Sequence, residues 1–72
     1  MNTQDFISTI NKLRLSSKNN WYAWEGTVNN KTVQLKGYNT YIQICIVNGK
    51  HCSDRLNLNV KHFKENLKRF VS

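Results

Sequence analysis

Apolar and polar residues alternate along the chain between Trp21 and Cys52, which is the pattern of half-buried β-strands. Pairs of residues that favour tight turns interrupt this pattern at Asn29-Asn30, Asn39-Thr40 and Asn48-Gly49. Asn-Gly is the strongest of these signals, because a type I′ turn needs positive φ at both central positions. The pattern therefore predicts an antiparallel meander of four strands, the last of them short: residues 21–28, 31–38, 41–47 and 50–52.

The turns also determine which side chains share a face of the sheet. A two-residue turn at Asn29-Asn30 pairs Trp24 with Leu35 and Trp21 with Tyr38. Since side chains alternate along a strand, one face collects the apolar residues of the expected core: Tyr22, Trp24, Val28, Val33, Leu35, Ile42, Ile44 and Ile46. The opposite face mixes aromatic, basic and polar side chains: Trp21, Thr32, Gln34, Lys36, Tyr38, Tyr41, Gln43, Cys45 and Lys50.

Residues before the meander follow the spacing of an amphipathic helix. Asn2 or Thr3 can cap its N-terminus, and Asp5 lies in the first turn, where a carboxylate suits the helix dipole. Polar residues 16–20 end the helix and lead to the first strand. The apolar stripe that should pack on the sheet consists of Phe6, Ile10 and Leu13, with Ile7 on its flank.

A second helix is predicted after the meander. Residues 53–58 turn the chain toward it, and Asn59 is its expected N-cap. Its apolar residues fall within about 100° of one another on a helical wheel: Val60, Phe63, Leu67, Phe70 and Val71.

These elements predict a single α+β domain over residues 1–72. The order is α-β-β-β-β-α, a four-stranded antiparallel meander with a short fourth strand and with the N- and C-terminal helices packed on one face. The helices should bury Phe6, Ile10, Leu13, Phe63, Leu67 and Phe70 against Trp24, Leu35, Ile42 and Ile44.

The chain is strongly basic. Its net charge is +7 and its isoelectric point is near 9.8, which favours an anionic partner: nucleic acid, an acidic protein surface or a membrane surface. The alternative is that the charge only keeps the domain soluble. The polar N-terminus predicts no signal peptide, and no segment approaches the roughly 18 apolar residues of a membrane span. We therefore expect no membrane partner and a cytoplasmic location.

Two cysteines without a secretory signal favour reduced thiols. Extending the strands from the Asn48-Gly49 turn places Cys45 opposite Cys52, at a hydrogen-bonded position where Cα atoms lie about 5.5 Å apart. We expect the two side chains to face each other but to remain reduced.

No motif predicts metal binding, a cofactor or catalysis. His51 and Cys52 are adjacent, so their side chains point to opposite faces of a strand and do not converge on a metal. The few carboxylates show no spacing that forms an acid–base pair, and no third group orients an imidazole beside a thiol. We expect a protein that is not an enzyme.

The outer face of the sheet carries the candidate binding residues. Aromatic side chains interleaved with cations suit stacking on unpaired bases, and they equally suit the anchors of a protein interface. Cross-strand aromatic pairs also stabilise sheets without any ligand. The candidate residues on this face are Trp21, Gln34, Lys36, Tyr38, Tyr41, Gln43 and Lys50.

A second candidate surface follows the C-terminal helix. Lys61, Lys64 and Lys68 form a stripe beside the apolar face, with Arg69 further round. The stripe suits contacts with phosphates spaced along a nucleic-acid backbone, and it is also typical of a solvated helix face.

Two resemblances bear on function. The α-β-β-β-α order is similar to the double-stranded-RNA-binding domain, but Asp54, Leu56 and Leu58 occupy the region of that family's lysine cluster, so its RNA-binding residues are not carried over. In size, layout and a composition rich in asparagine and lysine without proline, the chain resembles small phage-encoded inhibitors, among them anti-CRISPR proteins.

The second resemblance implies a non-enzymatic protein that blocks a host protein or ribonucleoprotein complex by occupying its surface, in the host cytoplasm if the gene is phage-encoded. The alternative is a nucleic-acid-binding domain that uses the outer sheet face and the lysine stripe. A dimer through the outer sheet face is compatible with either function.

Overall fold

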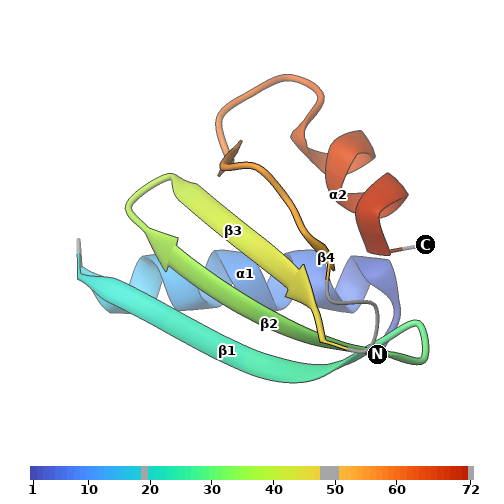
Figure 1. Cartoon of the computed structure of the whole chain (residues 1–72). Helices are drawn as coiled ribbons and strands as arrows, with labels where there is room; N and C mark the ends of the chain where they lie inside the picture. Colours follow the sequence, from blue (N-terminus) through green and yellow to red (C-terminus); the bar gives the residue numbers. More distant parts are fainter. Residues whose placement is uncertain (19, 48–50, 72) are drawn as a thin grey trace.

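The computed structural model describes residues 1–18, 20–47 and 51–71 (Figure 1). The elements are α1 (Thr3–Ser17), β1 (Trp21–Val28), β2 (Lys31–Tyr38), β3 (Tyr41–Ile46), β4 (His51–Cys52), β5 (Leu56–Asn57) and α2 (Phe63–Val71). The strands form one antiparallel sheet in the order β1-β2-β3-β4, and β5 also pairs with β3. The predicted α+β class and the meander are confirmed.

Asparagines form the turns of the meander because they tolerate positive φ. Asn29 and Asn30 have φ values of 50° and 67°, as a type I′ turn requires, and Asn39 has a φ of 56°. The resulting register pairs Trp21 with Tyr38 and Trp24 with Leu35, as predicted. The Asn48-Gly49 turn and Lys50 lie outside the described residues.

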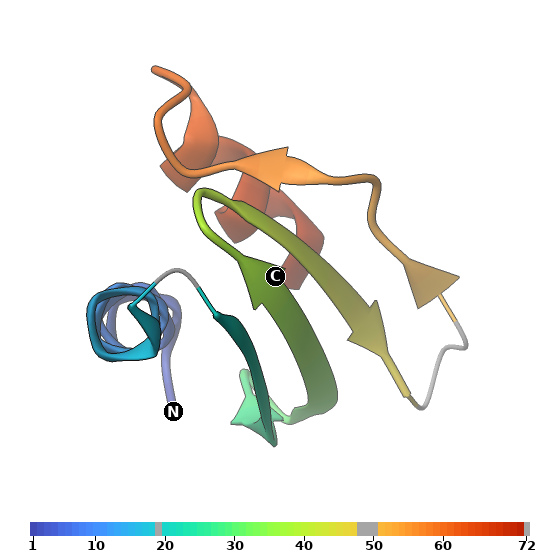
Figure 2. The same cartoon turned by 90° about the vertical axis from the view of Figure 1, so that its left-hand side faces the viewer.

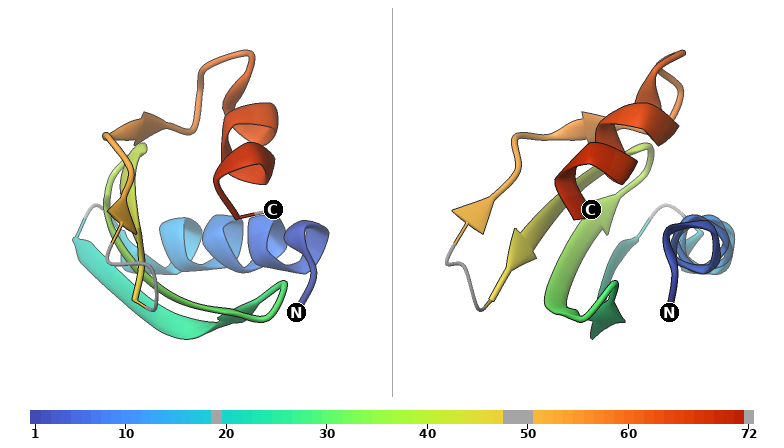
Figure 3. Two further views of the ribbon diagram at one scale, coloured as in Figure 1. Left: turned by 45° about the vertical axis from the view of Figure 1, so that its right-hand side comes forward. Right: turned by 90° about the vertical axis from the view of Figure 1, so that its right-hand side faces the viewer.

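Both helices pack on one face of the sheet, and Figures 2 and 3 show the other face left open. Of the helical residues expected in the core, Phe6, Ile10, Phe63 and Leu67 are buried, whereas Leu13 and Phe70 are half-buried. Trp24 is also half-buried, and its ring centroid lies 5.4 Å from that of Phe6. The buried core consists of Phe6, Ile7, Ile10, Tyr22, Val28, Val33, Leu35, Ile42, Ile44, Ile46, Phe63, Leu67 and Val71.

Tyr22 packs across a glycine on the neighbouring strand. Gly37 is its cross-strand partner, and a Cβ atom on Gly37 would overlap the Tyr22 ring. The absence of a side chain there lets the ring lie against the backbone of β2, within the core. Gly37 is therefore a packing requirement of this end of the sheet.

The N-terminal helix begins and ends where the sequence predicts. Asn2 is the N-cap, and its side-chain oxygen accepts a hydrogen bond of 2.8 Å from the backbone N–H of Asp5. Lys18, in the left-handed region with φ of 50°, ends the helix. Of the two candidate caps, Asn2 takes the role because its short amide reaches the free N–H groups of the first turn.

The C-terminal helix begins later than predicted, and Asn59 is not its N-cap. The side chain of Asn57 instead accepts a hydrogen bond of 2.8 Å from the Asn59 N–H, and its carbonyl accepts one of 3.2 Å from Val60. Pairing of β5 with β3 keeps the chain extended as far as Asn57, so a turn has to follow before the helix can start at Phe63. Val60 is consequently 47% exposed and lies outside the apolar face of the helix.

The predicted connection over residues 53–58 is a bulge followed by a strand. Cys45 pairs with Cys52 on one side of the bulge and Ile42 with Leu56 on the other, so residues 53–55 lie opposite only Gln43 and Ile44. One extra residue in one strand of an antiparallel pair is a β-bulge, which bends the strand and re-aims its side chains. β4 and β5 are thus the two halves of a bulged fourth strand.

Candidate binding site

Three aromatic side chains form a row across the open face of the sheet. Trp21 on β1 is opposite Tyr38 on β2, with ring centroids 5.1 Å apart and planes inclined by 39°. Tyr41 on β3 is opposite Tyr38 on its other side. Trp21, Tyr38 and Tyr41 are 73%, 44% and 50% exposed, so the row is a surface feature and not part of the core.

A basic and polar row lies beside the aromatic one. Lys36, two residues before Tyr38 on β2, is paired across the strands with Gln43 on β3. Together with Arg55 from the bulge, these side chains and the three rings line a groove of about 320 Å³. The groove therefore has an aromatic side and a basic side, and no carboxylate is among the described residues that line it.

The bulge positions Arg55, which the sequence did not single out. Ser53 holds the bulge against β3, because its N–H donates to the Ile44 carbonyl at 2.7 Å and its Oγ accepts from the Ile44 N–H at 3.0 Å. Gln43 adds a third bond, from its Nε2 to the Ser53 carbonyl at 3.2 Å. Arg55 follows two residues later, before β5 begins, and reaches the groove from the edge of the sheet.

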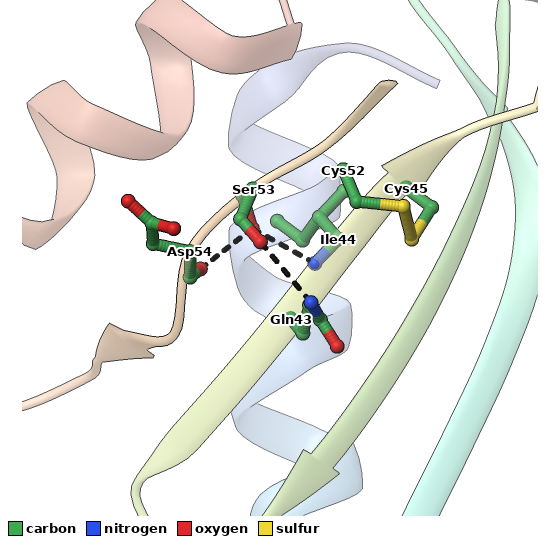
Figure 4. Close-up of a disulfide and its surroundings, with 6 residues drawn as sticks. All are labelled: Gln43, Ile44, Cys45, Cys52, Ser53 and Asp54. Atoms are coloured by element: carbon green, nitrogen blue, oxygen red, sulfur yellow. Dashed lines mark hydrogen bonds between the residues drawn. A yellow bond between two sulfur atoms is a disulfide. The ribbon is translucent and has the colours of Figure 1, made fainter. Parts of the chain in front are cut away.

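A disulfide joins Cys45 and Cys52 beside these bonds (Figure 4), so the expectation of reduced cysteines is wrong for this structure. The two residues are opposite each other as predicted, but at a different kind of site. The Ser53 N–H donates to the Ile44 carbonyl, so Ile44 and Ser53, the pair next to the two cysteines, are a hydrogen-bonded pair. The cysteines thus occupy a non-hydrogen-bonded position, where the chains approach more closely, and their Cα atoms lie 4.0 Å apart.

Of the other predicted residues of the outer face, Gln34 lies outside the groove. Gln34 is on the same face, but its Nε2 donates to Glu25 Oε1 at 3.0 Å across the strands. Lys50 lies outside the described residues. Of the seven candidates on this face, the structure brings five together in the groove: Trp21, Lys36, Tyr38, Tyr41 and Gln43.

The predicted lysine stripe does not join this groove. Lys64 and Lys68 line a separate depression of about 260 Å³ with Thr3 and Gln4 of α1, on the side of the molecule that the helices cover. Lys61 precedes α2 and is exposed in the turn before it, because the helix starts at Phe63. The stripe is thus shorter than predicted and belongs to the opposite side of the sheet.

Arg69 lies in a third place, near the end of α2. It borders a depression with His51 and Phe70, whose rings are stacked with centroids 5.1 Å apart. This contact links β4 to α2 and lies apart from the aromatic row.

One titratable group in the core has a shifted pKa. Burial raises the pKa of the Tyr22 hydroxyl above its ordinary value of 10.0, and the positive charge of Arg14 opposes that rise. The hydroxyl is buried without a hydrogen-bond partner in the described part of the chain. Tyr22 is part of the buried core and does not line the groove.

Within residues 1–18, 20–47 and 51–71, three or more His, Cys, Asp or Glu side chains nowhere gather in a way that could hold a metal ion. No helix in the same ranges is long and apolar enough to cross a membrane. The chain matches no protein-family model, no curated protein and no solved structure, so the groove has to be interpreted from its own residues.

Proposed function

We propose that this chain is a small non-enzymatic binding protein that blocks a host protein or ribonucleoprotein complex by covering part of its surface. In this proposal it is a phage-type inhibitor of the anti-CRISPR kind and works in the host cytoplasm. The groove on the outer sheet face is the surface that engages the target.

The observation that carries the proposal is the exposure of three aromatic rings on a face that the helices leave open. Trp, Tyr and Arg are the residues that most often anchor protein interfaces. They expose a large apolar area and still offer hydrogen-bonding groups, and Trp and Tyr lose little conformational entropy when they are buried. Trp21, Tyr38 and Arg55 supply all three residue types within one groove.

The positive charge of the groove also supports the proposal that this surface engages the target. Lys36 and Arg55 lie in the groove, and neither forms an ion pair within the described residues. Together with the net charge of +7, they favour encounter with an acidic surface and disfavour basic ones.

A pull-down from a host lysate tests the proposal. The tagged protein should recover one host assembly in a fixed ratio, and a parallel lysate treated with nuclease shows whether the contact is with protein or with exposed nucleic acid of a ribonucleoprotein complex. Replacing Trp21 and Tyr41 by Ala should abolish recovery, whereas replacing Lys64 and Lys68 by Gln on the helix side should not. Equal recovery by the two variants, or recovery of nucleic acid with no fixed host assembly, would contradict the proposal.

A further inference from the structure

The groove separates its aromatic groups from its cations. Trp21, Tyr38 and Tyr41 come from three consecutive strands and form one side of the groove. Lys36 and Arg55 lie on the other side, on β2 and in the bulge beyond β3. Adjacent strands are roughly 4.8 Å apart, so the backbones that carry the two cations are separated by roughly 10 Å across the sheet. A ligand along the groove therefore meets rings on one side and positive charge on the other.

A single nucleic-acid strand has the matching distribution of chemical groups, with flat bases on one side and phosphates on the other. Aromatic side chains on the face of an antiparallel sheet stack on bases in known binders of single-stranded RNA. Aromatic side chains can stack on any base, because every base has a π-face. Nearby cations hold the phosphate backbone of the strand.

An acidic peptide fits the groove less well. Carboxylates would pair with Lys36 and Arg55, but an acidic side chain offers no aromatic face to the three rings in the lining. Duplex DNA or RNA also fits poorly, because its bases are stacked on one another and are not free to meet the rings.

We propose that the groove binds a single-stranded segment of nucleic acid, with unpaired bases on Trp21, Tyr38 and Tyr41 and phosphates on Lys36 and Arg55. This inference rests on the proposed function in one respect, namely that the outer sheet face is the contact surface. In a ribonucleoprotein target, the exposed single strand is the part that the groove holds.

Fluorescence anisotropy with labelled oligouridylate and oligothymidylate of about eight nucleotides tests the inference. Both probes should bind, and both should quench the fluorescence of Trp21. In a Trp21→Phe variant the quenching should disappear, since Trp24 lies on the inner face against Phe6. A difference in affinity between the probes distinguishes RNA from DNA as the preferred source of the strand.

Two sets of variants separate stacking from charge. Tyr38→Ala should weaken binding by about 5- to 150-fold, with the dependence on salt unchanged, because a stacking ring carries no charge. Lys36→Gln with Arg55→Gln should lower the slope of log K against log salt by about 1.4, that is about 0.7 for each phosphate that the protein no longer neutralises. The control, Lys64→Gln with Lys68→Gln, removes the same number of charges on the helix side and should leave the slope unchanged.

Several results would overturn the inference. Polyglutamate that competes as well as the oligonucleotides would show that the groove recognises charge alone. An equal loss of affinity in the groove and helix-side charge variants would show nonspecific attraction. Failure of both oligonucleotides to bind, alongside a nuclease-resistant host complex that the groove variants cannot form, would leave the proposed function standing and assign the groove to a protein surface. Sedimentation that shows a dimer broken by Trp21→Ala would assign the groove to a second copy of the chain.

Discussion

Cys45 on β3 and Cys52 on β4 are directly opposite each other on the outer face of the sheet, and a disulfide joins them. The bond closes a loop with a sequence separation of only seven residues. The bond holds β4, a strand of only two residues, against β3. The bulge that carries Arg55 follows directly after β4. The edge of the groove thus depends in part on a bond that a reductant can break.

We predict that reduction of this disulfide lowers the free energy of unfolding by about 2.5 kcal/mol, the value that loop entropy gives for a loop of this length. Urea unfolding with and without a thiol reductant measures the difference, and intact mass shows whether two hydrogens have been added. Cys45→Ser with Cys52→Ser should match the reduced protein and should not respond to reductant. Rapid alkylation of both thiols in the native, untreated protein would show that the bond is absent in solution.

Replacing Gly37 by Ala should destabilise the fold by about 1–3 kcal/mol, because the added methyl group overlaps the buried Tyr22 ring and forces it to move. The midpoint of urea unfolding measures the loss of stability. A Tyr22→Leu background provides the control, since the penalty for Gly37→Ala should shrink once the ring is gone. If Gly37→Ala is as stable as the parent protein, the ring does not lie against this glycine.

The Tyr22 hydroxyl should make stability fall at alkaline pH. Its pKa is raised in the folded state, mainly by burial. Above pH 10, near the pKa of an unfolded tyrosine, the unfolded chain therefore releases a proton that the folded chain retains. The free energy of unfolding decreases with pH over this range, and below it the hydroxyl contributes no dependence on pH.

Tyr22→Phe isolates this contribution. Near neutral pH the variant should be at least as stable as the parent, because the buried hydroxyl lacks a hydrogen-bond partner among the described residues. Above pH 10 it should gain stability relative to the parent, as measured by urea unfolding of both proteins at about pH 8 and pH 11. Parallel stability curves across that range would mean that Tyr22 ionises as freely in the folded protein as in the unfolded chain.

Local sequence signals were sufficient for most of the fold. Positive φ at Asn29 and Asn30 determines the first turn, and that turn determines the register that places Trp21 beside Tyr38. The spacing of Phe6 and Ile10 likewise determines which side of α1 meets the sheet. In each case the decisive interaction lies within a few residues or follows from strict alternation along a strand.

The bulge and its consequences could not be predicted in this way. Leu56 and Asn57 look like part of a turn, and they form a strand only because the edge of β3 offers free backbone partners. That pairing removes Asn59 from its expected capping role, leaves Val60 exposed and brings Arg55 to the groove. One inserted residue changes the register without changing the hydrophobic pattern, so Arg55 carried no signal in the sequence beyond its charge.

In the function that we propose, the target binds to the outer face of the sheet. Changing Lys36 to Glu and Tyr38 to Ala removes a groove cation and the central ring of the aromatic row, and both side chains are exposed. The thermal midpoint should therefore move little, because surface substitutions usually change stability by no more than about 0.5 kcal/mol. The matched control is the triple change of Lys61, Lys64 and Lys68 to Gln, which alters the net charge by three units, whereas Lys36→Glu alters it by two.

The affinity of these two variants for the target recovered from the host is the most direct measurement of that claim. The sheet variant should lose binding although it changes the charge less, and the helix variant should bind nearly as well as the parent protein. Full affinity in the sheet variant, or a greater loss of affinity in the helix variant, would contradict the claim that the outer sheet face engages the target.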